Sequence, residues 1–386
     1  MTKDSLNIAI VGGGIAGLAL GCTLKMNSID CTIFEKSHDV SDYGAGISIS
    51  RNVLKIFEKL NLIDELRLNS FQPEETIWKY RNKEFLRMPV DIYSMSRQKL
   101  FKVFYDKYIN LNGDILFNHE LKSVSNNGKV IKFCNAQTYN VNHIAACDGI
   151  KSIIRENYFS SSKPKYSGFN AWRGTGRADK KDLEFNLGPH THSVSYPINQ
   201  KLDRSFVGIV RSNSWMEESW KKEGSIEEFL NEFKYFDDKI ISMFSHSSKI
   251  FKWGIFIREP LKKLFQNNIT LLGDAAHPMV PFIGQGGCMA IEDAYIFGIL
   301  CNKYNSNFTL IQQLYEKIRM SRVNKIQRMS LQQAGLYHIK NSFLAILRNN
   351  VMKYTNIIPR RIKFIWDYDA DQHIENVTSK QKNNSF

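Results

Sequence analysis

The sequence predicts an α/β fold into which an antiparallel-sheet domain is inserted, with a helical segment toward the C-terminal end. Three observations carry this prediction. The chain opens on an apolar run, a glycine-rich turn, a helical pattern and a second apolar run, which is the order of a βαβ unit with parallel strands. From about 167 to 253 short strand patterns alternate with turns, as in an antiparallel sheet. A buried strand and a long apolar helix then return after residue 268.

The first unit is built around the stretch "VGGGIAG". "NIAIV" and "CTIFEK" predict buried strands, and "AGLALGCTLKMNS" between them has helical spacing. Gly12, Gly14 and Gly17 have G-x-G-x-x-G spacing, which serves a tight turn, close approach of the backbone to a pyrophosphate, and packing of helix on strand. Glu35 ends the next strand, where a carboxylate would hold a ribose. We therefore predict a Rossmann-like dinucleotide site, for FAD or NAD.

The later elements follow in chain order. "NVLKIFEKLNLIDELRL" and "SRQKLFKVFYDKYINLNG" predict amphipathic helices, the second with Ser96 as its N-cap. "SIEEFLNEFKYFDDKIISMF" predicts a helix in the sheet region, and helical patterns continue from Ile291 toward Asp369. The dinucleotide-binding domain is expected to be discontinuous. Its predicted segments are residues 1–75, 95–165 and 260–325, with the sheet domain at 76–94 and 166–259, C-terminal helices at 326–372 and a disordered tail at 373–386.

Composition and charge exclude several classes of protein. Among the 386 residues, 43% are hydrophobic and 23% are charged, which is typical of a soluble globular protein. The net charge of +14 would suit nucleic acid or an anionic membrane, but the lysines are scattered and no RNA-binding signature occurs, so no nucleic-acid partner is expected. The N-terminal apolar run is interrupted by five glycines and is too short for a signal peptide or a membrane span.

The cysteines favour a reducing compartment. They are spread without the CxxC pairs of zinc or thioredoxin-like sites, so no metal is predicted. Most have apolar neighbours, which indicates reduced and buried thiols. The prediction is a cytoplasmic protein, either a monomer or a homodimer. The six cysteines are Cys22, Cys31, Cys134, Cys147, Cys288 and Cys301.

Two further motifs favour FAD over NAD. In "ACDGIKSIIRENYF", Ser152 and Arg155 follow Asp148; taken alone, this stretch also fits a capping aspartate with a solvated arginine. "GDAAHPMVPFIGQGG" places Asp274 at a strand end and a glycine cluster before an apolar helix. The positive end of that helix can face an anionic or electron-accepting group. One dinucleotide held at both ends suits FAD, with its ADP at the first turn, its ribityl chain at Asp274 and its ring at the second helix.

At these residues the chain resembles the group A FAD-dependent aromatic monooxygenases of the 4-hydroxybenzoate hydroxylase and salicylate hydroxylase type. The shared motifs are GxGxxG, DGxxSxxR and GDAAHxxxPxxGQGxxxAxEDA, in order between Leu6 and Arg328. "SGFNAWRG", "SVSYPI" and "YEKIRMSRVNKIQRMS" are most similar to the branch of salicylate hydroxylase, zeaxanthin epoxidase and FAD-dependent urate hydroxylase. "IGQGGCMAIEDA" resembles the urate hydroxylase's version of the third motif.

Carried over by position, the resemblance implies a set of FAD contacts. Glu35 and Lys36 would contact the adenosine ribose, and the backbone of Leu121 would contact the adenine. Arg51 stands where family members often have proline, so the local turn or the flavin's movement is expected to differ. The implied cofactor-binding set is Gly12, Gly14, Ala16, Gly17, Glu35, Lys36, Ser48, Arg97, Leu121, Asp274, Gly284, Gln285, Gly286, Gly287 and Cys288.

The resemblance also implies the reaction. NADH or NADPH would reduce the FAD without a second Rossmann domain, and one G-x-G-x-x-G motif is present. Reduced flavin and O₂ would give a C4a-hydroperoxide that hydroxylates a small aromatic or heteroaromatic substrate, while the protein orients the substrate and excludes water. Pro281 would border the face that reacts with oxygen. The helix after Gly287 would stabilise negative charge on the flavin, and His277 would fix its turn by hydrogen bonding.

The substrate contacts are predicted from the middle sheet. His192 lies near a substrate-binding arginine of the urate hydroxylase, and Phe206 near a substrate-contacting tyrosine, which disfavours urate itself. His192 is the predicted catalytic side chain, as a base toward a phenol or a ligand of a carboxylate. The alternative places His190 and His192 on a strand face in solvent. The predicted substrate-binding set is Arg173, His192, Tyr196 and Phe206.

Several alternatives stay open. Arg173 also suits an ion pair with a carboxylate or the flavin phosphate, and Tyr196 and Trp172 also suit core positions. The chain could be an FAD-dependent epoxidase or oxidoreductase acting on an isoprenoid or polyketide-type compound, or a non-catalytic flavin-binding protein; a halogenase is disfavoured by the absence of WxWxIP. The segment "NSFLAILRNNVMKYTNIIPRRIKFIW" mixes apolar and basic residues, which fits packing on the flavin domain or contact with a membrane surface.

Overall fold

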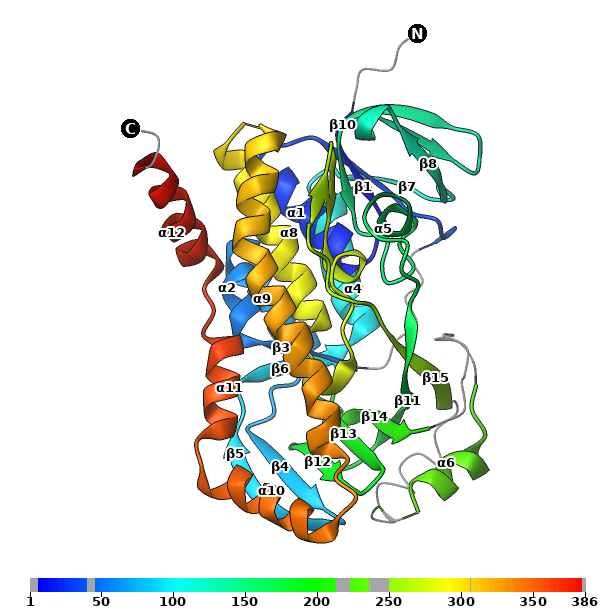
Figure 1. Cartoon of the computed structure of the whole chain (residues 1–386), viewed down its shortest axis with the longest axis vertical. Helices are drawn as coiled ribbons and strands as arrows, with labels where there is room; N and C mark the ends of the chain where they lie inside the picture. Colours follow the sequence, from blue (N-terminus) through cyan, green and yellow to red (C-terminus); the bar gives the residue numbers. More distant parts are fainter. Residues whose placement is uncertain are drawn as a thin grey trace.

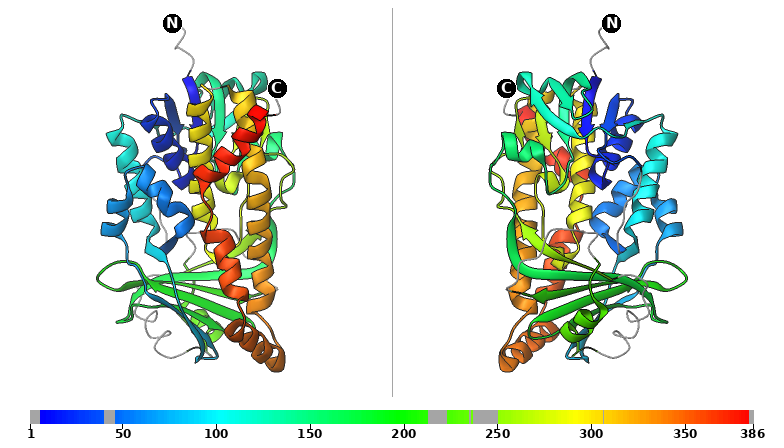
Figure 2. Two further views of the ribbon diagram at one scale, coloured as in Figure 1. Left: turned by 90° about the vertical axis from the view of Figure 1, so that its left-hand side faces the viewer. Right: turned by 90° about the vertical axis from the view of Figure 1, so that its right-hand side faces the viewer.

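The computed structural model has two layered regions joined by a long helix (Figure 1). It describes residues 6–39, 46–212, 223–234, 236, 250–305 and 307–383. The N-terminal parallel sheet and its helices form one region, and a large sheet crosses the other end of the molecule (Figure 2). The α/β fold with an inserted sheet is thus the predicted one. No helix of the described chain is long and apolar enough to cross a bilayer.

The parallel sheet has the strand order β16-β17-β10-β1-β2-β7. β1 lies at the centre of this sheet and pairs in parallel with β10 on one side and β2 on the other. Its side chains are apolar on both faces, because helices cover both faces of the sheet. β8 and β9 extend β10 as an antiparallel arm. The strands are β1 (Leu6–Val11), β2 (Cys31–Phe34), β7 (Asp114–Leu116), β8 (Leu121–Ser125), β9 (Val130–Phe133), β10 (Thr138–Ala146), β16 (Phe265–Gln266) and β17 (Ile269–Leu271).

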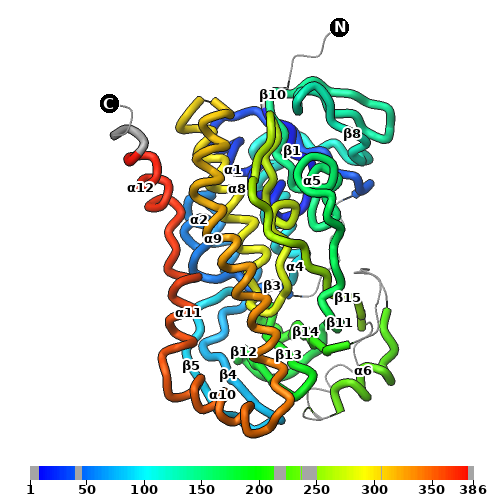
Figure 3. Tube along the Cα trace, in the orientation of Figure 1, coloured from blue at the N-terminus to red at the C-terminus, as the bar shows by residue number. Residues whose placement is uncertain are grey.

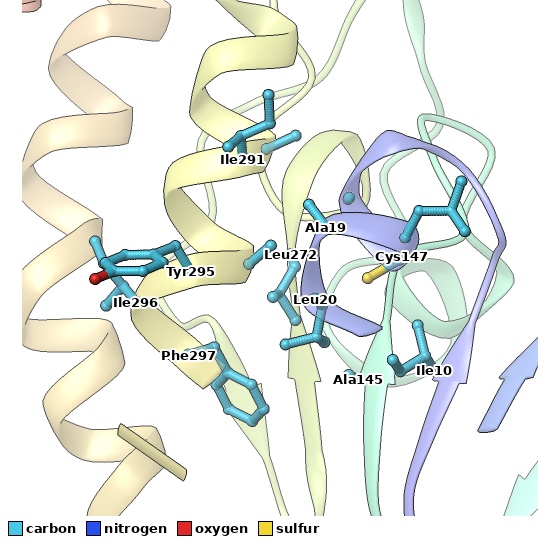
Figure 4. Packing of buried hydrophobic residues seen from close by; sticks show 14 of the residues in the cluster. Ile10, Ala19, Leu20, Ala145, Cys147, Leu272, Ile291, Tyr295, Ile296 and Phe297 are labelled. Atoms are coloured by element: carbon cyan, nitrogen blue, oxygen red, sulfur yellow. The ribbon is translucent and has the colours of Figure 1, made fainter. Parts of the chain in front are cut away.

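Helices α1 (Ile15–Met26) and α8 (Gly286–Lys303) form the core of this region. Both are apolar around most of their circumference, so both are buried between the sheet and the outer helices. Figure 4 shows Leu20 of α1 near Leu272 and Ala145, with Phe297 of α8 in the same buried cluster. A Cβ at Gly298 would lie 2.6 Å from the Thr23 methyl carbon, so glycine lets the two helices approach closely.

A two-stranded ribbon and smaller helices connect the two regions. β3 (Gly46–Ser50) pairs with β6 (Ile92–Ser96), and the Ser96 hydroxyl caps α4 by accepting from the Lys99 amide, as the sequence predicted. The helices here are α2 (Arg51–Lys59), α3 (Ile63–Asn69), α4 (Arg97–Asn110) and α5 (Ile153–Tyr158).

The second sheet has the order β15-β11-β14-β13-β12-β4-β5. Its pairs are antiparallel, as predicted, except that β4 and β12 run in parallel. α6 (Ile226–Glu232) covers its outer face, while the rest of the predicted helix from 225 to 244 lies mostly outside the described residues. The strands are β4 (Glu75–Tyr80), β5 (Lys83–Pro89), β11 (Lys165–Arg177), β12 (Leu183–Leu187), β13 (Thr191–Pro197), β14 (Asp203–Arg211) and β15 (Ile250–Ile257).

In the described chain, α8 is followed by one long helix that runs most of the length of the molecule, and by three shorter helices that lead back along it (Figure 3). α9 (Phe308–Tyr337) crosses the predicted domain boundary at 325/326 without a break, because its buried face continues from one region to the other. α10 (Ser342–Tyr354), α11 (Ile357–Trp366) and α12 (Ala370–Asn383) come next. The prediction of a disordered tail from residue 373 is wrong as far as residue 383, because α12 is helical there. This helix is bound to α8: Tyr295 donates to Asp371 (2.8 Å), and Lys303 donates to Thr378 (2.8 Å).

A fully buried cluster of four charges joins α8 to α9. Arg319 donates to Asp293 (2.6 Å) and to Glu292 (2.6 Å), and Arg322 donates to both oxygens of Glu292. Asp293 also accepts from the amide of Gly273 (2.8 Å) and from His277. Burial by itself would raise the pKa of Asp293, but His277 and Arg319 hold it at about 2. The cluster therefore keeps its charges and fixes the turn that precedes α8.

Arg319→Met should destabilise the protein by about 3–5 kcal/mol, because it leaves buried carboxylates without their main partner while keeping the side-chain volume. Equilibrium unfolding in urea measures the loss. Arg87→Met is the matched control, since Arg87 pairs with Glu75 and Glu84 on the exposed surface and such pairs contribute little. Equal, small changes for both variants would contradict the role given to the cluster.

Candidate functional site

The first glycine turn is shaped by close backbone contacts. A Cβ at Gly12, whose φ is +105°, would lie 2.4 Å from the carbonyl oxygen of Cys147, and one at Gly17 would lie 2.0 Å from that of Gly12. Gly14 differs: within the described chain, its Cβ would meet no atom closer than 4 Å. Two glycines are thus required by packing, and the third leaves a space open to solvent that a ligand can occupy.

The open space lies at the N-terminus of α1. Gly14 is the N-cap residue and has no side chain that could accept from the first-turn amides. Those amides and the positive end of the helix dipole suit a phosphate. Ala16, in the same turn, is buried beside Gly273 of the second motif, with which its methyl group is in near contact. The two glycine motifs therefore meet at this point.

A cleft of about 200 Å³ opens beside the turn. Five predicted cofactor contacts line it, from β1, β2 and β8, together with side chains that the sequence analysis did not select. It lies where the carboxyl ends of parallel strands diverge, which is the usual position of a nucleotide in this kind of sheet. The lining residues are Val11, Gly12, Gly14, Phe34, Glu35, Lys36, His119, Glu120, Leu121, Cys147, Asp148, Gly149, Lys151 and Ile153.

Glu35 orders the turn from the end of β2. Its Oε2 accepts from the Gly13 amide (2.7 Å), and its Oε1 accepts from the amide and the hydroxyl of Ser37 (2.9 Å each). The carboxylate is consequently held in one orientation at the edge of the cleft, where Oε2 retains capacity to accept a further hydrogen bond. Its contact with a ribose remains a prediction.

The DGxxSxxR motif connects the two glycine turns. Ser152 caps α5 by accepting from the Arg155 amide (2.9 Å). Arg155 is completely buried and donates to the carbonyls of Ala275 (3.2 Å) and Ala276 (2.7 Å). The alternative of a solvated arginine is therefore wrong, because the side chain reaches inward to carbonyls far along the chain. Burial lowers the pKa of Arg155 to about 10, so the guanidinium stays charged at neutral pH.

The second turn presents Asp274 and the start of α8. Asp274 is open to solvent, yet the surrounding protein raises its pKa by desolvation, against the opposing charges of Arg97 and His277. The hydrogen bond from His277 to Asp293 fixes this turn, as the sequence predicted. Arg97, the first residue of α4, lies close enough to act on Asp274 through space.

The predicted contacts around α8 fall into two groups. Gly286 and Gly287 form the first helical turn, after Gly284 in the left-handed conformation (φ +65°). Gln285 and Cys288 instead point inward: Gln285 donates to the Ser50 hydroxyl (2.9 Å) and Cys288 to the Ser48 carbonyl. Their side chains hold β3 against α8, which leaves the helix's first amides and positive end available to a ligand.

On the second sheet, alternation along the strands separates the predicted substrate contacts. His192, Tyr196 and Arg173 lie on the inner face, toward α9 and the turn that contains Pro281. Phe206 lies on the outer face and packs on Phe229 of α6. The prediction that Phe206 contacts substrate is therefore corrected: a one-residue offset on a strand places a side chain on the opposite face.

His192 is buried rather than in solvent, whereas His190 is exposed. Its ring packs on Phe282, next to Pro281, with centroids 5.4 Å apart. Its Nδ1 shares a hydrogen bond of 2.8 Å with Nε2 of His338. Burial, with a smaller contribution from His338, lowers the pKa of His192 well below its usual range, and burial lowers that of His338 to about 3. Both rings are neutral at physiological pH.

Arg173 and Tyr196 have protein partners on this face. Arg173 lies over the rings of Trp253 (5.1 Å) and Phe251 (5.6 Å). Tyr196 is buried against Gly46 of β3, where a Cβ would lie 2.6 Å from its ring, and burial raises its pKa to about 12. Tyr196 therefore lies between the sheet and the β3–β6 ribbon, whereas Arg173 lies against side chains of β15. Their contact with a substrate remains a prediction.

Sequence reasoning missed His338, which lies 146 residues from His192 and belongs to no motif. It also gave no role to Asp293 and Glu292, although "EDA" was part of the recognised motif. The sequence did contain a signal for these two acids, because two carboxylates in an otherwise apolar helix require buried partners. Those partners, Arg319 and Arg322, stand at i and i+3 on the following helix.

Comparison with known proteins identifies the class. The family model described as "FAD binding domain" matches residues 5–328, which is most of the chain. The chain therefore belongs to this family of FAD-binding proteins. The match covers all three motifs and both regions of the fold, and the predicted family, fold and FAD are confirmed.

Among curated relatives, the chain is 27% identical over 374 residues to 3-amino-4-hydroxybenzoate 2-monooxygenase PtmB3 of Streptomyces platensis, which covers 91% of this chain and 94% of the relative. Among solved structures, a salicylate hydroxylase substrate complex superposes with a TM-score of 0.81 at 20% identity, covering 97% and 98%. Klebsiella pneumoniae HpxO complexed with FAD and uric acid also gives 0.81 at 20% identity, covering 94% and 96%. The relatives are monooxygenases and hydroxylases by name, which agrees with the predicted enzyme class.

Gly14→Val should weaken FAD binding at least about tenfold, since the added methyls occupy the space left for the pyrophosphate and each ~1.4 kcal/mol changes affinity tenfold. Titration of the flavin-free protein with FAD measures it by fluorescence. Gly335→Val is the matched control: its Cβ also meets no atom of the described chain within 4 Å, but it lies on α9 away from the cleft. Equal FAD affinities of the two variants would show that the diphosphate does not bind at this turn.

Proposed function

We propose that the protein is an FAD-dependent monooxygenase that uses NADH or NADPH and O₂ to hydroxylate a small aromatic or heteroaromatic compound. One observation carries the proposal: two helix N-termini are each preceded by glycines, their motifs meet where Ala16 lies beside Gly273, and the first opens on a cleft where Gly14 leaves room for a ligand. The motifs, the family and the names of the relatives support the same activity.

The residues present fit FAD. The turn at Gly14 and the first amides of α1 would hold the diphosphate, with Glu35 at the ribose and Leu121 at the adenine. Asp274 would bind the ribityl chain, and the amides of Gly286 and Gly287 would face the pyrimidine edge of the flavin ring. When bound, the flavin supplies the redox chemistry that activates oxygen.

The chain's own residues provide the field and the enclosure. The positive end of α8 favours negative charge on the group that it faces, and its amides are held in place because Gln285, Cys288 and the buried charge cluster fix the helix. The inner face of the second sheet packs mainly apolar side chains against Val280 and Phe282 of the second turn, and this layer would exclude water from the flavin. Pro281 lies on the exposed side of its turn, bordering the space between helix and sheet.

His192 would position the substrate rather than act as a free base. Its low pKa and its hydrogen bond to His338 make it a neutral, oriented ring beside Phe282. A neutral imidazole can donate to or accept from a phenol, and its pair with His338 selects the tautomer. Arg173 would attract an acidic group on the substrate, held between the rings of Trp253 and Phe251.

The proposal includes a cytoplasmic location. All six cysteines lie in the part of the chain that the structure describes, and none of them is paired in a disulfide. That usage is typical of a reducing compartment. A monomer or a homodimer remains the expected state.

The activity is tested by measuring NADH and NADPH oxidation by the purified yellow protein with a panel of aromatic acids, phenols and purines. At least one compound should stimulate oxidation, with hydroxylated product formed in proportion. Stimulation by isoprenoids or polyketides alone, with epoxidised product, would favour the epoxidase alternative. Bound flavin with no stimulated turnover across the panel would favour a non-catalytic flavin protein.

With a turned-over compound in hand, His192→Ala should lower kcat/KM by about tenfold to a hundredfold, the usual cost of misplacing a substrate, while flavin content is retained. His190→Ala is the control, because His190 is exposed just before the same strand. Steady-state kinetics and the flavin absorbance of both variants are compared. Unchanged kinetics in His192→Ala would exclude His192 from the substrate site.

A further inference from the structure

The helix α10 exposes its apolar side chains. Phe343 and Tyr354 are each 74% exposed, Ile346 53% and Leu347 51%. At 100° per residue these positions, with Leu344 and Val351, fall on one side of the helix, an arc that Asn350 shares. Large apolar side chains that gather on one exposed face mark a surface for binding, whereas scattered ones do not.

The orientation of α10 is fixed by its buried side. Arg348 is only 7% exposed and donates to the carbonyls of Leu336 (2.7 Å) and Tyr337 (3.2 Å), with its guanidinium over the ring of Tyr80. Met352 packs in the inner core beneath the sheet. The helix is therefore inverted relative to an ordinary surface helix: a cation faces the protein and the apolar arc faces outward.

The helices of this face carry charge of one sign, and Glu84 on the neighbouring strand β5 is paired with Arg87. From Lys317 to Trp366 the sequence contains no aspartate or glutamate. Lys340, Lys353, Arg360 and Lys363 are exposed next to the apolar arc or on α11. A second copy of the chain would bring these cations against their equivalents across a two-fold axis, which opposes self-association. An anionic surface is complementary to both the arc and its cations.

The location of α10 suits a flat partner. It lies at the end of the molecule farthest from both chain termini, with α11 beside it (Figures 1 and 2). Its 13 residues are too few to span a bilayer, which needs about 20. A helix of this kind can lie in the interface, with aromatic and aliphatic side chains below the headgroups and Lys or Arg at their level.

We propose that α10 and α11 form a docking surface for a membrane that contains anionic lipids. Phe343, Ile346, Leu347 and Tyr354 insert between the headgroups, while the neighbouring cations contact the lipid phosphates. Bound in this way, the protein places its sheet domain beside the bilayer and keeps the nucleotide cleft at the other end in water. The surface uses no cofactor contact, so it can be tested apart from catalysis.

The test is co-flotation of the flavin-loaded, full-length protein with vesicles. We expect it to float with an equimolar mixture of phosphatidylglycerol and phosphatidylcholine, to bind pure phosphatidylcholine at least about tenfold more weakly, and to lose binding as salt screens the charges. The variant Phe343→Ser/Leu347→Ser should reduce flotation about tenfold or more. Leu68→Ser is the matched control, because Leu68 is an apolar side chain that is 76% exposed elsewhere, on α3.

Three results would overturn the proposal. The wild-type protein could stay at the bottom of the gradient with either vesicle. Phe343→Ser/Leu347→Ser could float as well as the wild type and Leu68→Ser. Light scattering could show a wild-type dimer that this variant alone dissociates, in which case the face binds a second copy. Circular dichroism and retained flavin absorbance verify that the variants are folded.

Discussion

The buried charge cluster of α8 and α9 is the constraint on which the remaining structure depends. Asp293 accepts at once from the Gly273 amide, from His277 and from Arg319, so one carboxylate fixes a backbone turn, a side chain and a neighbouring helix. Glu292 joins the same helices through Arg319 and Arg322 and reaches Asn52 of α2 (2.7 Å). Breaking any of these bonds would leave a charge in a medium that cannot solvate it. The start of α8 is rigid for this reason.

Arg155 extends that rigidity to the first glycine turn. It spans from α5, behind the nucleotide cleft, to the carbonyls of the second motif. Gly12 packs on the carbonyl of Cys147, the first residue of the loop between β10 and α5. The two helix N-termini proposed to hold the diphosphate and the flavin ring are thereby kept at a set separation. A ligand with charged or electron-accepting groups at two distant points requires such a separation to be built before it binds.

α9 couples this region to the second sheet. Its first half carries the arginines of the cluster, and its last residue, Tyr337, packs on His192, with His338 just beyond. The same helix end supplies the carbonyls that hold Arg348, which sets the outward face of α10. The proposed substrate face, the end of α9 and the proposed membrane surface are consequently consecutive layers, and a displacement at one would be transmitted through close packing to the next.

The sequence alone determined the features that arise within a few residues of the chain. The packing roles of Gly12 and Gly17, the cap at Ser96 and the hydrogen bonding of His277 follow from spacing, because backbone geometry and helix ends are local. Only the tertiary structure decided that Phe206 faces outward, that Arg155 is buried, that His192 meets His338 and that α10 turns its apolar side to solvent. Each depends on which distant surface covers a given face, and one sequence pattern is compatible with either outcome until the partner elements are in place.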